Sequence, residues 1–273
     1  MKYNLADICE YAKGKVDVAI LDDETYISTE NMMPNKGGIT SASSLPTIAQ
    51  TQAFLAGDVL VSNIRPYFKK IWFAEFDGGC SNDVLVFRAK NGVSKRFLYY
   101  VLADDTFFDY SMATSKGTKM PRGDKAAIMH YEVPDFTYEE QEKIAGILEA
   151  LDRKIQLNTE INENLLQQAQ ALYKERFVDM RPFDGVMPAD WHLGTVKEII
   201  ELHDSKRIPL SSRERANLAK IYPYYGATSV MDYVDRYLFD GIYLLLGEDG
   251  TVVDSKGFPI LQYVEGKFWV NNH

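Results

Sequence analysis

Short apolar runs separated by turn residues dominate the first part of the chain. Residues 54–61, 70–76 and 82–88 form three such runs, and a glycine pair at 78–79 lies between two of them. Runs of this length between turn signals are typical of β-strands. We therefore predict a mixed α/β domain over residues 1–135.

The apolar spacing then changes from strand-like to helical. Residues 95–108 are predicted to form a helix, because their apolar side chains fall on one face. These side chains are Phe97, Leu98, Val101, Leu102 and Phe108. The following residues, 111–125, are polar and rich in glycine and lysine, which predicts a loop.

A much longer helix is predicted to begin after Thr137. Thr137 and Glu140 have the spacing of a capping box, and no proline interrupts the chain until Arg181-Pro182. A helix of about 40 residues would extend about 60 Å. Its apolar positions alternate by four and three residues, which is typical of a coiled-coil seam. The predicted helix-pairing residues are Ile144, Leu148, Leu151, Ile155, Asn158, Asn162, Leu165, Ala169 and Leu172.

Such a helix needs a partner surface, because helix propensity alone does not stabilise it. One alternative is that the helix packs along its own domain, with Asn158 and Asn162 exposed or bonded locally. The other is that it pairs with another helix, and that the two asparagines fix the register. The sequence contains no second pattern of this length, so in that case the partner is another chain or another part of the same assembly.

After Pro188 the mixed α/β pattern returns. Residues 191–200 resemble residues 3–10, and residues 237–244 resemble residues 54–60. This similarity indicates an internal repeat of about 185 residues, whose second copy has no counterpart of the long helix. The predicted fold class is α+β, with a globular domain at 1–135, a long coiled-coil-type helix at 136–181 and an incomplete second domain at 182–273.

The composition is that of a folded protein, with 46% hydrophobic residues. No apolar run approaches the roughly 20 residues of a membrane-spanning helix, and the first residues lack the apolar core of a signal peptide. Two cysteines are too few for a disulfide framework. We therefore expect a cytoplasmic protein with no membrane association. The net charge of −9 does not exclude nucleic acid, because local patches decide phosphate binding.

The sequence shows little sign of catalysis. It contains no glycine-rich phosphate-binding loop and no nucleophile elbow, and its four histidines lack metal-ligand spacing. Glu248 and Asp249 could act as paired carboxylates of an enzyme, although an acidic turn between strands is the favoured interpretation. We expect no catalytic residue and no metal site.

Basic residues gather in one predicted loop. Residues 111–125 contain Lys116, Lys119 and Arg122 together with Ser and Thr hydroxyls. Such side chains suit contacts with phosphates and base edges, although a mobile solvated loop is an alternative.

Two other stretches could join this loop. The glycine-rich residues 35–44 carry Lys36 and Ser41, and a basic turn follows at residues 65–70. Tyr67 and Phe68 of that turn are favoured as core residues at strand spacing, and Arg65 could instead form a structural ion pair with Asp58 or Asp83. The candidate DNA-binding residues are Lys36, Ser41, Arg65, Lys69, Lys116, Lys119 and Arg122.

Several segments of the chain have a pattern typical of one known family: Gly117–Arg122, Val133-Pro134, residues 139–148, residues 56–66 and Tyr222–Ala227. Through these segments the chain resembles the specificity subunit of type I restriction-modification systems. The resemblance implies two target recognition domains that each read half of a split site in double-stranded DNA. It also implies long helices that pack antiparallel and hold the two domains apart.

The resemblance further implies a non-catalytic subunit. DNA methyltransferase subunits dock on such a subunit, and restriction (motor-nuclease) subunits join them. S-adenosylmethionine, ATP and Mg²⁺ would be bound only by these partners. Because the second recognition domain is incomplete in this sequence, we expect a truncated product or a fragment, and a homodimer through the long helix that reads an interrupted palindrome. The alternative is an assembly scaffold that binds methyltransferase subunits without DNA specificity of its own.

Overall fold

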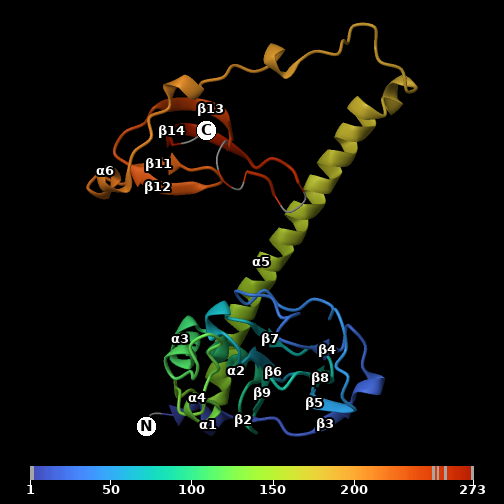
Figure 1. Cartoon of the computed structure of the whole chain (residues 1–273), viewed down its shortest axis with the longest axis vertical. Coiled ribbons are helices and arrows are strands. Elements are labelled where there is room, and N and C mark those ends of the chain that lie inside the picture. Colours follow the sequence, from blue (N-terminus) through green and yellow to red (C-terminus); the bar gives the residue numbers. More distant parts are fainter. Residues whose placement is uncertain (1–2, 248–249, 251, 255–256, 272–273) are drawn as a thin grey trace. The chain divides into compact units, whose positions relative to one another are not determined.

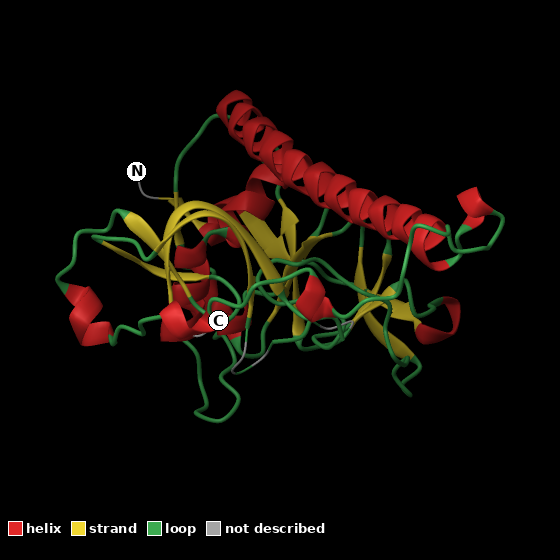
Figure 2. Ribbon diagram, turned by 90° about the horizontal axis from the view of Figure 1, so that it is seen from above, coloured by secondary structure: helices red, strands yellow, loops and turns green. Residues whose placement is uncertain are grey.

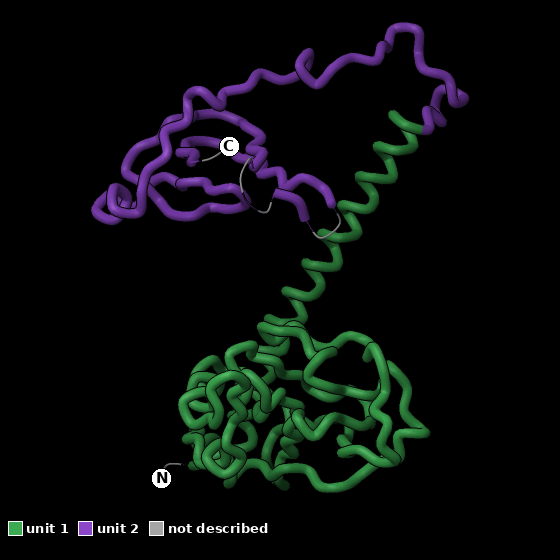
Figure 3. The backbone as a smooth tube through the Cα atoms, viewed as in Figure 1, with its two compact units in different colours: residues 1–178 green, residues 179–273 purple. Residues whose placement is uncertain are grey.

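The computed structural model describes residues 3–247, 250, 252–254 and 257–271. The chain forms two compact units, residues 1–178 and residues 179–273 (Figure 3). The long helix belongs to the first unit, whereas the sequence analysis treated it as a separate segment. Among the described residues, no helix has both the length and the apolar character needed to cross a bilayer.

Two four-stranded sheets and a short strand pair build the first unit (Figure 1). The first sheet has the order β2 (Cys9–Tyr11), β9 (Val84–Ala89), β6 (Val59–Ser62) and β7 (Ile71–Phe73), and all its pairs are antiparallel. The second has the order β3 (Lys15–Asp17), β5 (Gln50–Phe54), β8 (Gly78–Cys80) and β4 (Tyr26–Ile27), with β4 parallel to β8. Strand β1 (Tyr3–Asn4) pairs with β10 (Glu132–Val133).

Strand β6 lies at the centre of the core, because both of its faces are buried. Val59 and Val61 pack toward the helices, in a cluster that includes Leu98 of α2 (Lys95–Ala103) and Phe107 of α3 (Asp105–Ala113). Leu60 points to a second cluster on the other side of the sheet. The short helices α1 (Leu5–Ile8) and α4 (Lys125–Ile128) complete the helical side.

Two predicted elements are interrupted in the structure. The helix predicted at 95–108 is two helices, because Asp104 is extended and its carboxylate accepts a hydrogen bond from the backbone N–H of Thr106. Helix α3 also continues to Ala113, so the basic loop begins later than predicted. The apolar run at 54–61 is divided by a turn at Gly57, which has a φ of 91°.

The long helix α5 (Tyr138–Tyr173) has 36 residues and a complete Thr137–Glu140 capping box. It is the longest helical ribbon in Figure 2. A π-helical turn, η3 (Lys174–Val178), follows it. Only the first part of α5 is attached to α2. The Gln141 side chain accepts a hydrogen bond from Ser94 N, Arg96 pairs with Glu149, and Tyr100 donates to Asp152. Every residue from 149 to 178 is exposed.

The second unit contains one four-stranded sheet of order β12 (Val230–Val234), β11 (Tyr222–Tyr225), β14 (Leu261–Val270) and β13 (Phe239–Leu246). Phe239 and Phe268 stack within its core, and Tyr224 and Trp269 lie in a second cluster with helix α6 (Ser212–Ala216) nearby. Unlike β6, strand β13 leaves one face exposed, with Ile242 and Leu244 uncovered. The remaining short 3₁₀ turns are η1 (Val18–Ile20), η2 (Pro66–Phe68), η4 (Arg181–Phe183), η5 (Val196–Glu198) and η6 (Asp204–Lys206).

Candidate nucleic-acid interface

Backbone hydrogen bonds join the three basic stretches that the sequence analysis singled out. Asn35 N donates to Phe68 O at 2.8 Å, and Lys36 N donates to Lys69 O at 2.9 Å. Arg65 N in turn donates to Pro121 O at 2.8 Å. Loops that are far apart in the sequence therefore form one surface. We call its six cations the basic cluster: Lys36, Arg65, Lys69, Lys116, Lys119 and Arg122.

The loop at 116–122 closes on itself through two further backbone bonds. Lys116 N donates to Arg122 O at 2.9 Å, and Arg122 N donates to Lys116 O at 3.0 Å. Next to this closure, Gly123 has no room for a side chain, since a Cβ there would lie 2.8 Å from Ser111 Oγ and 2.9 Å from Asn63 Oδ1. The backbone thus fixes the positions at which the loop side chains leave it.

Backbone strain is concentrated at this surface. Six non-glycine residues in the described part of the chain have a positive φ, and four of them lie here: Asn35, Lys36, Arg65 and Lys69, with φ between 51° and 61°. Left-handed conformations cost a non-glycine residue roughly 1–2 kcal/mol. Strain of this kind tends to accumulate at functional sites, where the surrounding structure imposes it.

Carboxylates of neighbouring segments of the first unit pair with most of these cations. Lys36 and Lys69 both contact Asp105, at 2.8 and 2.9 Å, and Arg122 contacts Asp83 at 3.1 Å. Lys116 pairs with Asp124, the cap of α4, at 2.5 Å. Hydrogen bonds from Lys36 and then Lys69 lower the pKa of Asp105 to about 2, and the bond from Lys116 is the main cause that lowers the pKa of Asp124 to about 2. The acids are therefore charged at neutral pH.

Arg65 does not form the structural ion pair considered in the sequence analysis. Asp58 is held by Arg88 through two bonds of 2.8 and 2.6 Å, and Asp83 is held by Arg122. The Nε of Arg65 is buried and has no hydrogen-bond partner among the described residues. Arg65 thus retains a donor without a protein acceptor.

The interpretation of Tyr67 and Phe68 as core residues is wrong. Their exposed fractions are 49% and 38%, and their ring centroids lie 4.7 Å apart. Both side chains are exposed because residues 66–68 form the turn η2 instead of a strand. Strand periodicity therefore does not apply to them. Exposed rings next to cations could contact bases or sugars as well as a phosphate backbone.

Two of the predicted DNA-binding residues, Lys119 and Ser41, have no side-chain ion pair or hydrogen bond that ties them to the basic surface within the ranges that the structure describes. Lys119 is exposed and forms no ion pair in the described part of the chain. Ser41 is exposed as well, but its neighbours are bonded elsewhere, Thr40 N to Asn31 O and Ala42 N to Asp23 O. We find no hydrogen bond between Ser41 and the basic cluster among the described residues.

The sequence analysis considered Asp83 only as a partner of Arg65. It did not predict that Asp83 pairs with Arg122 or that Asp105 pairs with Lys36 and Lys69. These partners lie far apart in sequence.

No arrangement for catalysis is visible in the described residues. Cys9 and Cys80 are buried, and burial raises the pKa of each thiol to about 12. The described chain contains no group of three potential metal ligands. Glu248 and Asp249, the candidate enzymatic pair, lie outside the described residues.

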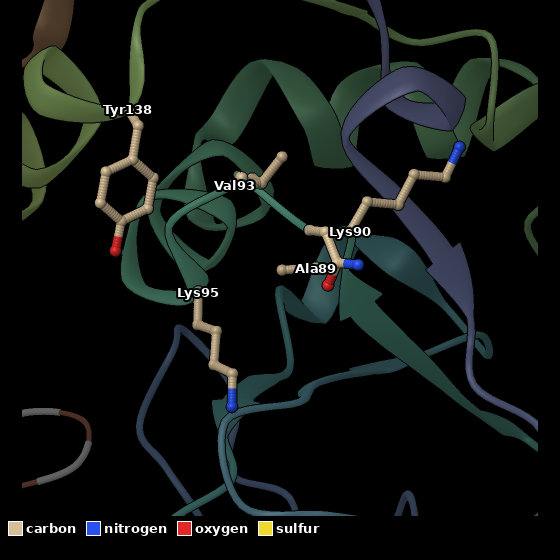
Figure 4. Close-up of a pocket in the computed structure, with 7 residues that line it drawn as sticks. Ala89, Lys90, Val93, Lys95 and Tyr138 are labelled. Atoms are coloured by element: carbon tan, nitrogen blue, oxygen red, sulfur yellow. The ribbon is translucent and has the colours of Figure 1, made fainter.

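The hollow in Figure 4 lies beside the start of α5 and not at the basic cluster. It has a volume of about 420 Å³ and is lined by residues 89–93, Lys95 and Tyr138. Lys90 uses its ammonium group to bond Ala6 O. The hollow contains none of the predicted site residues.

The seam of α5 forms a second candidate surface. Leu151, Ile155, Leu165 and Leu172 have exposed fractions between 54% and 66%. Asn158 and Asn162 are exposed as well, whereas Ile144 and Leu148 are half-buried near α2. The interpretation that the helix packs along its own domain thus holds only for its beginning.

Comparisons with known proteins agree on one family. The family model "Type I restriction modification DNA specificity domain" matches residues 1–167. The type I restriction enzyme HindI specificity subunit of Haemophilus influenzae is 32% identical over 192 residues, which cover 66% of this chain and 41% of that subunit. The EcoDI specificity subunit of Escherichia coli is 27% identical and covers 68% of this chain and 41% of that subunit. The chain thus spans about two fifths of the length of these relatives.

A solved structure shares the fold. The crystal structure of a type I restriction-modification S subunit from M. genitalium superposes with a TM-score of 0.63. The match covers 100% of this chain and 70% of that one, with 18% sequence identity. At this level of identity the likeness concerns the fold alone.

Proposed function

The chain belongs to the type I restriction-modification DNA specificity family, and from this premise we propose that its first unit recognises double-stranded DNA through the basic cluster. The observation that carries the proposal is the backbone network that brings three basic loops onto one surface. Cations that converge from separate loops suit the regular array of DNA phosphates.

The positions of the side chains suggest different roles. Arg122 is anchored by its backbone and presents a guanidinium that can bond two acceptors of guanine, as Lys119 can bond one. Lys36, Lys69 and Lys116 are compact point charges suited to phosphates. The exposed Tyr67 and Phe68 rings would lie against sugars or bases.

We further propose that the chain directs other subunits to a bipartite site and is not itself catalytic. Its relatives are named as specificity subunits of restriction enzymes. In this proposal DNA methyltransferase subunits and a restriction subunit bind the chain, and S-adenosylmethionine, ATP and Mg²⁺ belong to them. The exposed part of α5 supports a role in assembly, because a long apolar stripe in water is unfavourable without a partner.

The same helix supports a homodimer. The seam is symmetric about residue 160, since Asn158 and Asn162 are equidistant from it, as are Ile155 and Leu165, and Leu148 and Leu172. In an antiparallel pair of two copies, each of these six residues would therefore meet a seam residue of the other copy. The two asparagines would bond each other at the two-fold axis.

A DNA-binding titration tests the proposed function. The chain is co-purified with its methyltransferase subunit and titrated with randomised duplex at two salt concentrations. We expect enrichment of a split motif and an affinity that falls as salt rises. Lys36→Ala should weaken binding to all sequences, whereas Lys15→Ala, a change at an exposed lysine on β3, serves as the matched control.

The outcome also separates the two functions that the sequence left open. If the complex forms but no motif is enriched, and Lys36→Ala behaves like Lys15→Ala, the basic cluster does not bind DNA. The exposed stripe of α5 would then favour the assembly scaffold.

A further inference from the structure

Asp105 lies next to the basic cluster and contacts two of its lysines. It lies in the first turn of α3, and its two carboxylate oxygens are used separately. Lys36 Nζ contacts Oδ1 at 2.8 Å, and Lys69 Nζ contacts Oδ2 at 2.9 Å. One oxyanion therefore bridges two ammonium groups that come from two different loops.

The lysines are not brought together by Asp105 alone. Their loops are already joined by the bond from Lys36 N to Lys69 O, and both residues hold a left-handed backbone. The neighbouring Asp104 is engaged elsewhere, since its carboxylate bonds the N–H and hydroxyl of Thr106. The pair of ammonium groups is thus a preformed receptor for one oxyanion with two available oxygens.

A DNA phosphate has the same features as this carboxylate. It carries one negative charge and two non-bridging oxygens, each able to accept a bond from an ammonium group. Lys36 and Lys69 are about one third exposed, and the Asp105 carboxylate is 58% exposed, so a ligand from solvent can reach the pair.

We propose that Asp105 stands in for a DNA phosphate in the free protein and is displaced when DNA binds. This inference rests on the proposed function and adds a mechanism that limits non-specific DNA binding. Asp105 occupies both ammonium groups and offsets one of their two positive charges until a phosphate replaces it. It therefore opposes the weak binding of DNA of any sequence. In the target DNA sequence, base contacts elsewhere in the cluster offset the free-energy cost of displacing Asp105. A random sequence lacks these contacts. Asp105 is in this view a specificity-determining residue that never touches DNA.

The test compares Asp105→Asn with Asp109→Asn. Asp109 lies one turn further along α3, is exposed and forms no ion pair in the described part of the chain, so both variants lose the same charge. The complex with the methyltransferase subunit is titrated with random duplex at several salt concentrations. We expect Asp105→Asn to bind at least about threefold more tightly than Asp109→Asn, with a salt slope steeper by about one.

A second comparison assigns the effect to the two lysines. In a chain that also carries Lys36→Ala and Lys69→Ala, Asp105→Asn should bind random DNA no better than Asp109→Asn. Asp105→Glu should restore the wild-type slope. Thermal unfolding of each variant shows whether the fold is kept, and Asp105→Ser replaces Asp105→Asn if the latter does not fold.

Equal binding by Asp105→Asn and Asp109→Asn would overturn the inference, as would an increase that persists without the two lysines. Failure of the proposed function looks different. In that case the wild-type complex and the double lysine variant bind DNA alike at every salt concentration, whatever residue stands at position 105.

Discussion

Arg122 shows how much a single residue does in this surface. Its backbone closes the loop onto Lys116, and its guanidinium contacts Asp83 at 3.1 Å. The side chain is therefore held at a defined place within the protein itself. This combination of fixed backbone and fork-shaped donor is what reading a base edge requires.

Arg122→Ala should relax specificity at one base pair by about 1–3 kcal/mol. Arg122→Lys should keep most of the overall affinity and still lose the preference, since an ammonium group cannot form the two parallel bonds. Binding to duplexes that differ at one position of the enriched motif measures both. An equal loss for every duplex would instead assign Arg122 to a phosphate.

Substitutions at Lys69 separate the effect of backbone strain on stability from the effect of charge on DNA binding. Both Lys69→Gly and Lys69→Ala remove the ammonium group, but only glycine accepts a φ of 51° without strain. We expect Lys69→Gly to be more stable than Lys69→Ala by about 1 kcal/mol, as measured by urea unfolding. Both variants should bind DNA equally weakly. Equal stability would mean that the backbone changes conformation at this position.

At the scale of elements, α5 has two parts with different surroundings. Three polar contacts attach its beginning to α2, and every residue from 149 to 178 is exposed. The exposed part contains Asn158 and Asn162 near its middle. This exposed part could pair with a second copy in the opposite direction or in the same direction, and the two arrangements predict different neighbours.

Cysteine cross-linking distinguishes the two directions. In an antiparallel pair centred on residue 160, position 155 of one copy meets position 165 of the other. A chain with both Ile155→Cys and Leu165→Cys should form disulfide-linked dimers on mild oxidation, whereas Ile155→Cys alone should not. In a parallel pair position 155 meets position 155, so Ile155→Cys alone would also form disulfide-linked dimers. Cys9 and Cys80 are buried and should remain unreacted.

The elements show which signals in the sequence are reliable. The start of α5 was predictable, because the Thr137–Glu140 capping box is a local interaction. The break between α2 and α3 could not be predicted, since Asp104 has an extended backbone conformation while the apolar spacing continues across it. The lysines and arginines of the candidate site were selected from their local density, and their contact with DNA stays a prediction. Asp105 could not be selected in this way, because it meets Lys36 and Lys69 only after the chain has folded.

At the scale of the whole molecule, the proposed homodimer would carry two identical first units. Each would read the same half-site, so the enriched motif should be an interrupted palindrome. Replacing Asn158 and Asn162 with leucine should change the register or the number of copies, as measured by light scattering. An unchanged mass together with an asymmetric motif would contradict the two-fold arrangement.

The network that joins the basic loops consists of main-chain atoms. Asn35, Lys36 and Arg65 donate through their backbone N–H groups, and Phe68, Lys69 and Pro121 accept through carbonyl oxygens. Such bonds do not depend on which side chain a position carries. In the proposed interface, the side chains that would face DNA can therefore be exchanged while the main-chain network persists. If the proposal holds, a few surface substitutions should then give a new target sequence without a new fold.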